Sequence, residues 1–237
     1  MKKTSVPVHA LKRQARRLSR RDGIRLHAAL DRVAIREGFL AWSHLAASGG
    51  SGTANDEAGA LLCPGDLVLL GARPGQGKTL LALKLAIEAM QRGNRAAFFT
   101  LVFTEAEVAR CFGALEQDVG RFRDRLLIDT SDEISAGYIT SRLAATPPGT
   151  VVVIDYLQLL DQKRDHPALG EQVRELAAFA TSRGALVICL SQISRNYEPA
   201  SRSVPGPEDV RLPNPLDLAL FGKSLFLDGG RIRLAVP

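Results

Sequence analysis

Eight residues from Ala72 to Thr79 combine glycines, a lysine and a hydroxyl in the order that a phosphate-binding loop requires. Gly75 and Gly77 leave room for backbone N–H groups to surround phosphate oxygens, and the following helix adds the positive end of its dipole. We expect Lys78 to reach the β- and γ-phosphates of a nucleoside triphosphate and Thr79 to offer its hydroxyl to Mg²⁺. The predicted nucleotide-binding residues are Ala72, Arg73, Pro74, Gly75, Gln76, Gly77, Lys78 and Thr79. Ala72 departs from the motif, which has glycine first.

Two further polar residues follow apolar runs that are typical of buried strands. Residues 151–154 are all aliphatic and end at Asp155, and residues 185–190 lead to Ser191 and Gln192. Parallel strands deliver such residues to the carboxyl edge of a sheet, where ligands bind. We therefore expect Asp155 to hold the water shell of Mg²⁺ and Gln192 to sense the γ-phosphate. The alternative is that Asp155 caps the next turn and that Gln192 is simply a polar strand end.

The elements that must position these residues alternate between short apolar runs and longer helical patterns, which is typical of a mainly parallel sheet flanked by helices. The predicted strands cover residues 66–71, 95–101, 126–129, 150–155 and 185–190. The predicted helices cover residues 77–92, 104–117, 135–145 and 167–183. A β-hairpin over 223–228 and 231–236, turning at two glycines, completes the chain. The fold class is therefore α/β.

The positive charge lies at the N-terminus. The chain carries a net charge of +6, but residues 1–25 hold nine Lys and Arg against Asp22, so this segment is +8 and the remainder is −2. Leu11, Ala15 and Leu18 predict an amphipathic helix, and Leu26, Leu30 and Val33 predict a second one after a break near Asp22 and Gly23. The opposite face of the first helix carries Lys12, Arg13, Arg16, Arg17, Arg20 and Arg21. Such a face suits a phosphate backbone, or it is simply solvated.

The composition divides the chain into three parts. We predict a basic helical module over residues 1–46 and a flexible linker over 47–60, which contains no large apolar side chain. An ATPase-type domain follows over 61–237. No apolar run reaches the roughly 18 residues of a membrane helix, and the N-terminus lacks the apolar core of a secretory signal. The three cysteines are widely spaced and odd in number, which is typical of reduced thiols in a reducing compartment. We therefore expect a cytoplasmic protein without a membrane partner.

Three segments together resemble the RecA-like P-loop ATPase domain of the DnaB-type replicative helicases. They are residues 71–79, 154–160 and 190–195, of which Asp155-Tyr156-Leu157-Gln158-Leu159 is the most specific. Weaker likeness extends over residues 60–230. The resemblance implies ATP and Mg²⁺ as cofactors, DNA as a partner, and a homo-oligomer that is a hexamer in that family. The N-terminal module instead resembles a small helical module of plasmid or mobile-element proteins.

The chain departs from the family where the catalytic base is expected. The family's segment ends in Ser-Leu-Glu-Met, whose glutamate deprotonates the attacking water, whereas this chain has Val102 at the glutamate position. Valine accepts no proton, so hydrolysis should be slow. Glu105 is a candidate substitute base, although it also fits as an acid in the first turn of a helix begun by Thr104.

A second departure concerns the C-terminus, where the family places a lysine and an arginine finger that act on a neighbouring subunit's nucleotide. Arg231 and Arg233 are the remaining candidates, and both also fit as solvated hairpin residues. The loop over 196–213 lies where the related helicases contact DNA.

Three hypotheses follow from the sequence. The first is a DnaB-like ATPase that acts on or near DNA, as an accessory to replication or to a mobile element. The second is a degenerate scaffold that binds ATP, hydrolyses it poorly and regulates a partner. A small-molecule phosphotransferase is disfavoured by the residues from Asp155 to Gln158.

Overall fold

The computed structural model describes residues 8–36, 42, 61–161, 166–194, 204–212, 214–228 and 231–236. Within them, seven strands form one sheet in the order β3-β2-β4-β5-β1-β6-β7. The strands are β1 (Leu67–Ala72), β2 (Ala96–Thr100), β3 (Leu126–Asp129), β4 (Val151–Asp155), β5 (Leu186–Gln192), β6 (Lys223–Asp228) and β7 (Arg231–Ala235). All neighbours pair in parallel except β6 and β7, which form the predicted antiparallel hairpin.

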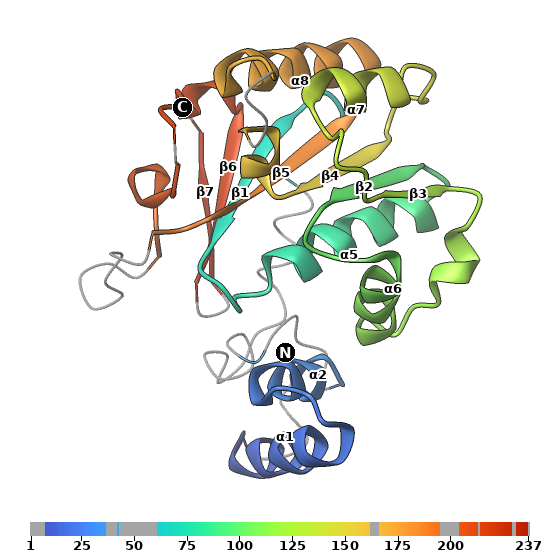
Figure 1. Cartoon of the computed structure of the whole chain (residues 1–237), viewed down its shortest axis with the longest axis vertical. Helices are drawn as coiled ribbons and strands as arrows, with labels where there is room; N and C mark the ends of the chain where they lie inside the picture. The colour runs from blue at the N-terminus through green and yellow to red at the C-terminus, as the bar shows by residue number, and fades with distance from the viewer. Residues whose placement is uncertain are drawn as a thin grey trace.

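Helices cover both faces of this sheet (Figure 1). They are α5 (Lys78–Gln91), α6 (Glu105–Ala114), α7 (Ala136–Arg142) and α8 (Leu169–Arg183), with 3₁₀ turns η1 (Val119–Phe122), η2 (Leu157–Asp161), η3 (Pro207–Asp209) and η4 (Leu218–Leu220). One core lies between the sheet and α5 and α6, and the other between the sheet and α7 and α8. The predicted α/β class is confirmed.

The central strands are apolar on both faces because both faces are covered. Along β2, Phe98 packs into the core under α5, and Phe99 packs into the core under α7 and α8. Successive side chains of a strand point to opposite faces, so a strand buried on both sides reads as a continuous apolar run. This is why strands could be predicted within one or two residues at their ends.

The helix ends differ more from the predictions. The helix expected over 104–117 ends at Ala114, and the one expected over 135–145 ends at Arg142. α8 ends at Gly184, as predicted, because that residue adopts the left-handed conformation that closes a helix (φ 59°).

The N-terminal helices α1 (Val8–Asp22) and α2 (Leu26–Arg36) pack on each other around a small core of their own. Leu11, Ala15 and Leu18 are buried, as their spacing predicted. The prediction for the second helix was wrong at Leu26, which is 43% exposed. The helix buries Ala29, Val33, Ala34 and Ile35, and Leu30 packs against the same core, so the predicted stripe holds at Leu30 and Val33. Of the predicted module, residues 1–7, 37–41 and 43–46 lie outside the described residues, as does the whole 47–60 linker, so this domain boundary stays a prediction.

The three cysteines are unpaired thiols. Cys189 is fully buried and Cys111 partly so, and burial raises their pKa values to about 12 and about 11 respectively. Cys63 is exposed. In the part of the chain that the structure describes, no helix has both the length and the apolarity needed to cross a bilayer.

Candidate nucleotide-binding site

The strand order gathers the predicted phosphate, metal and sensor residues at one edge of the sheet. β5 lies between β1 and β4, and all three strands are parallel. Their carboxyl ends therefore meet at the same edge, which brings together the phosphate loop after β1, Asp155 at the end of β4 and Gln192 at the end of β5. Ala72 and Gln192 are direct neighbours in the β1–β5 register.

The loop between β1 and α5 has the backbone geometry of an anion-binding turn. Gly75 and Gly77 adopt positive φ angles of 77° and 84°, which residues with a Cβ rarely adopt. α5 begins at Lys78, and no side chain caps its first turn from Gly77. Glycine at the N-cap offers no side-chain acceptor to the N–H groups at the start of α5, and a bound phosphate would supply acceptors there.

Gly71, just before the loop, explains how β1 fits the sheet. A Cβ at this position would lie 2.9 Å from the ring of Phe226 on β6 and 3.2 Å from Ile193 Cδ1 after β5. The first distance is shorter than Cβ contacts in proteins, and the second is tight enough that Ile193 would have to shift. The glycine that the motif lacks at position 72 is therefore present one residue earlier, where close packing of neighbouring strands requires it.

Thr79 and Asp155 form the candidate Mg²⁺ site. The Thr79 hydroxyl donates to Asp155 Oδ2 over 2.9 Å, and Asp155 is only 2% exposed. Burial raises the pKa of Asp155, while Lys78 and the Thr79 hydrogen bond lower it in part. A buried carboxylate beside a hydroxyl supplies the oxygen ligands that Mg²⁺ prefers, and a cation would compensate its charge. The residues present therefore fit the metal that the sequence predicted.

We predict that Asp155→Asn stabilises the metal-free, nucleotide-free protein. The raised pKa means that the folded state disfavours the carboxylate, so ionised Asp155 costs stability at neutral pH. Removing that charge should add about 1 kcal/mol to the free energy of unfolding, or roughly 2–4 °C in Tm.

Thermal unfolding in EDTA at several pH values checks this prediction. The difference between variant and wild type should grow as the pH rises above about 3.9, the pKa of aspartate in the unfolded chain, and should level off above the raised pKa of folded Asp155. It should be smallest well below about pH 3.9, where the acid is protonated in both folded and unfolded chains. A variant that is less stable than wild type at neutral pH would show that the charge is already well compensated.

The segment after β2 carries the departure at Val102. Thr100 is buried beside Asp155 in the β2–β4 register, and its hydroxyl accepts hydrogen bonds from the N–H groups of Val102 (3.0 Å) and Phe103 (3.3 Å). This turn is thereby fixed at the same edge of the sheet as the phosphate loop. Val102 itself is 51% exposed. An exposed apolar side chain stands where the resemblance predicts the base.

Glu105 lies in the first turn of α6, where the alternative interpretation of this residue as a first-turn acid placed it. Thr104 caps the helix, and a reciprocal pair of hydrogen bonds joins it to Glu107. These bonds lower the pKa of Glu107. Glu105 takes no part in the cap and is exposed.

Gln158 is a residue whose contacts the sequence did not reveal. Its side-chain N–H group donates to Ser191 Oγ (3.2 Å) and to the Arg211 carbonyl (2.6 Å). The Arg211 N–H group in turn donates to the Gln192 carbonyl (2.8 Å). The described end of the predicted DNA loop, residues 204–212, is thus tied to the strand that ends at Gln192. Residues 195–203 of that loop region lie outside the described part.

The guanidinium group of Arg73, a residue of the predicted phosphate loop, pairs with Asp228 at the end of β6. Nη2 and Nε donate to Asp228 Oδ1 over 2.7 and 3.2 Å. Asp228 ends β6, and the two candidate finger residues Arg231 and Arg233 follow on β7, where both are exposed. Arg73 thus belongs to the loop by its backbone, whereas its side chain joins the loop to the hairpin.

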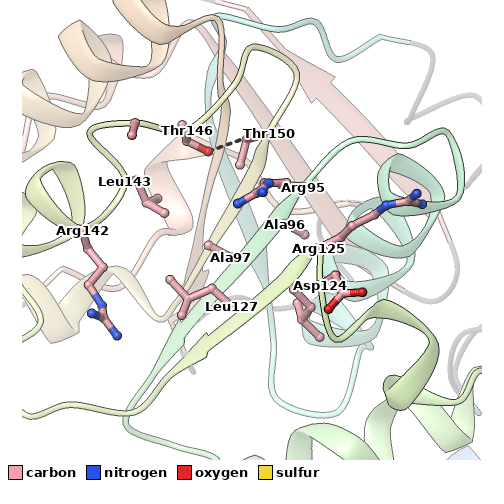
Figure 2. A pocket seen from close by; sticks show the side chains of 12 residues that line it. Arg95, Ala96, Ala97, Asp124, Arg125, Leu127, Arg142, Leu143, Thr146 and Thr150 are labelled. Carbon is pink, nitrogen blue, oxygen red and sulfur yellow. Dashed lines mark hydrogen bonds between the residues drawn. The ribbon is translucent and has the colours of Figure 1, made fainter.

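A pocket of about 370 Å³ lies elsewhere, at the starts of β2 and β3 (Figure 2). Arg95, Arg125 and Arg142 are among its lining residues. Arg125 donates to the Met90 carbonyl, and Arg142 pairs with Asp129. This pocket contains none of the predicted nucleotide-binding residues and opens at the opposite end of the strands, so we do not assign the nucleotide to it.

Comparison with known proteins supports the resemblance. Residues 112–213 match the family described as DnaB-like helicase C terminal domain. The chain is 25% identical over 200 residues to the "Probable plasmid replicative DNA helicase" of Chlamydia muridarum (strain MoPn / Nigg), covering 70% of this chain and 44% of that protein. It is 29% identical over 177 residues to the replicative DNA helicase DnaB of Synechocystis sp. (strain ATCC 27184 / PCC 6803 / Kazusa), covering 62% of this chain and 20% of the relative. The alignments thus span less than half of each relative.

Solved structures share the fold. A KaiC-like protein from the hyperthermophilic archaeon Pyrococcus horikoshii superposes with a TM-score of 0.52 at 17% identity, covering 68% of this chain and 70% of that one. A DnaB-like replicative helicase, studied with primase, gives a TM-score of 0.56 at 21% identity over 92% of this chain and 64% of that one. At these identities the structures establish the RecA-like fold alone.

Proposed function

We propose that this chain binds ATP with Mg²⁺ and acts as a helicase-type ATPase on DNA, as a member of the DnaB-type replicative helicases that residues 112–213 resemble. The observation that carries the proposal is the meeting of Lys78, Thr79 and Asp155 at one edge of the sheet, with Thr79 Oγ1 and Asp155 Oδ2 2.9 Å apart. Among its relatives are plasmid helicases, so we further propose a role in the replication of a plasmid or another mobile element.

Each residue of the site has a distinct proposed role. The backbone N–H groups from Gly75 to Thr79 surround the phosphates, and Lys78 neutralises charge on the β- and γ-phosphates. Thr79 and Asp155 hold Mg²⁺, which supplies further neutralisation of the phosphate charge. Gln192 sits beside the start of the loop and is proposed to sense the γ-phosphate.

DNA binding is proposed for α1 and for the loop over 196–213. The six cationic side chains of α1 from Lys12 to Arg21 are exposed on the face opposite its buried stripe. Closely spaced exposed cations on one helix face attract a phosphate backbone. Such binding weakens as the salt concentration rises, because binding releases the counterions of the nucleic acid. A homo-oligomer, as in the helicase family, is part of the same proposal.

The second candidate function is a nucleotide-binding scaffold that holds ATP without efficient hydrolysis and regulates a partner. Val102 favours it, because an exposed valine replaces the expected base. The two candidates agree on ATP binding and differ on turnover.

Separate measurements of binding and turnover test the proposal. We expect calorimetry to show saturable ATP binding that requires Mg²⁺, and single-stranded DNA to bind with an affinity that falls steeply with salt. Replacing Arg13 and Arg17 with glutamine should lower the salt slope by about 0.7 for each phosphate that the helix no longer neutralises. ATP turnover that rises with DNA would favour the helicase-type ATPase, and binding without turnover would favour the scaffold. Absence of any ATP binding would refute both.

A further inference from the structure

Arg73 and Asp228 join two parts of the chain that lie 155 residues apart. β1 and β6 pair in parallel, and Ala72 lies opposite Leu227 in their register. The next residue along each segment is therefore Arg73 on one side and Asp228 on the other. The register itself places the second position of the phosphate loop against the tip of the C-terminal hairpin.

The contact is close and largely shielded from water. Arg73 Nη2 lies 2.7 Å from Asp228 Oδ1, and Nε donates to the same oxygen over 3.2 Å. The Asp228 side chain is 11% exposed and that of Arg73 is 31% exposed. If Arg73 were removed, the nearly buried Asp228 carboxylate would remain desolvated with no opposite charge to compensate it. Breaking the pair should therefore lower the stability of the fold.

The position of the pair makes it relevant to the loop. Pro74 and Gly75 follow Arg73 directly, and Gly75 already adopts the left-handed backbone needed for the turn. Anchoring the side chain at position 73 restrains where this turn begins. It also neutralises a carboxylate that would otherwise stand, unpaired, at the strand end adjoining a site for a highly charged anion.

We propose that Asp228 is a positioning residue for the phosphate loop and that it acts through Arg73. This inference rests on the proposed binding of ATP. Arg73 then contributes to nucleotide affinity without using its guanidinium group as a phosphate ligand. Asp228 at the end of β6 thereby fixes the conformation of the phosphate loop, although the two lie 155 residues apart in the sequence.

A double-mutant cycle separates this role from direct phosphate contact. The variants are Arg73→Gln, Asp228→Asn and the double variant, with ATP dissociation constants measured by calorimetry in Mg²⁺ well below the Tm of each protein. We expect each single change to weaken ATP binding by about tenfold, and the double variant to bind about as well as either single one. The exchanged pair, Arg73→Asp with Asp228→Arg, should recover most of the affinity.

The opposite outcome is equally clear. If Arg73 were a phosphate ligand held back by Asp228, then Asp228→Asn would free it and strengthen ATP binding. Tighter binding by Asp228→Asn, or effects that simply add in the double variant, would overturn the proposal. Arg73→Lys serves as a second variant should Arg73→Gln fail to fold, because it keeps the charge but cannot donate from two nitrogens.

A matched control uses a second pair of an arginine with a buried aspartate at a strand end. Asp129 ends β3, on the opposite flank of the sheet, and Arg142 Nε lies 3.2 Å from its Oδ2. Arg142→Ala should lower stability without changing ATP affinity.

The same cycle in denaturant, without nucleotide, measures the coupling of Arg73 and Asp228 directly. Absence of coupling there would refute the pair itself. If the cycle shows coupling but the wild-type protein binds no ATP, the pair is real and the proposed function is refuted, together with the positioning role.

Discussion

Lys78→Ala will weaken ATP binding by roughly a hundredfold, because it removes a charge-assisted contact to the phosphates and a cation that interacts with the candidate metal-binding acid Asp155. Lys78 is the first residue of α5 and lies near enough to Asp155 to lower the pKa of its carboxyl group. Without Lys78 that pKa rises further, since burial then acts with less opposition. The variant therefore loses phosphate affinity and also holds its metal-binding acid less readily as a carboxylate.

Calorimetry with ATP and Mg²⁺ checks this expectation, and Lys84→Ala is its matched control. Lys84 lies on the same helix and pairs with Glu88 at 3.5 Å. Its removal changes the charge of α5 equally but should leave the dissociation constant for ATP within a factor of about two, since it lies beyond the first turn. Equal affinity of Lys78→Ala and wild type would refute the assignment of the phosphate loop.

The phosphate loop and Asp155 could be predicted because two local patterns suffice for them. A glycine-rich turn between an apolar strand and a helix has few other uses, and an apolar run that ends in an acid delivers that acid to the carboxyl edge of a parallel sheet. Neither inference needs the order of the strands. Topology then does the rest, because parallel strands place all such ends on the same side.

The contact between Arg73 and Asp228 could not be predicted in the same way. It depends on β6 lying beside β1, and nothing in either segment's composition specifies which strands become neighbours. Arg73 was predicted to bind the nucleotide because it lies within the phosphate-loop motif, which specifies no partner for its side chain. In the structure the nearer opposite charge, on the adjoining strand end, takes its guanidinium group.

Gln172 shows a similar limit in the core. It lies on α8 and is 1% exposed. Its side-chain oxygen accepts from the Ala136 N–H group, and its nitrogen donates to the carbonyls of Leu160 and Pro167. A helical pattern assigns a glutamine to the solvated face. Here it is buried because three backbone groups at the ends of other elements need partners, and those groups come together only in the fold.

Val102→Glu will raise ATP turnover by roughly a hundredfold if the base alone is missing. The structure favours this test because Val102 is 51% exposed, so a carboxylate there needs no burial. The preceding turn is held by Thr100, beside Asp155 in register, and the N–H group of residue 102 that makes one of its bonds is unaffected by the side chain. A glutamate would therefore project from a fixed turn at the edge where Lys78, Thr79 and Asp155 meet.

Steady-state turnover with and without single-stranded DNA, alongside Val102→Gln, gives the measurement. Glutamine has nearly the shape of glutamate but accepts no proton, so only the glutamate variant should gain. Glu105→Gln in the wild-type background asks whether residual turnover already depends on Glu105, which is exposed in the first turn of α6. If Val102→Glu binds ATP normally and still fails to turn it over, the site has lost more than its base. The chain would then act as a nucleotide-binding scaffold. A protein that binds the triphosphate but cannot activate water can report to a partner only that ATP is bound.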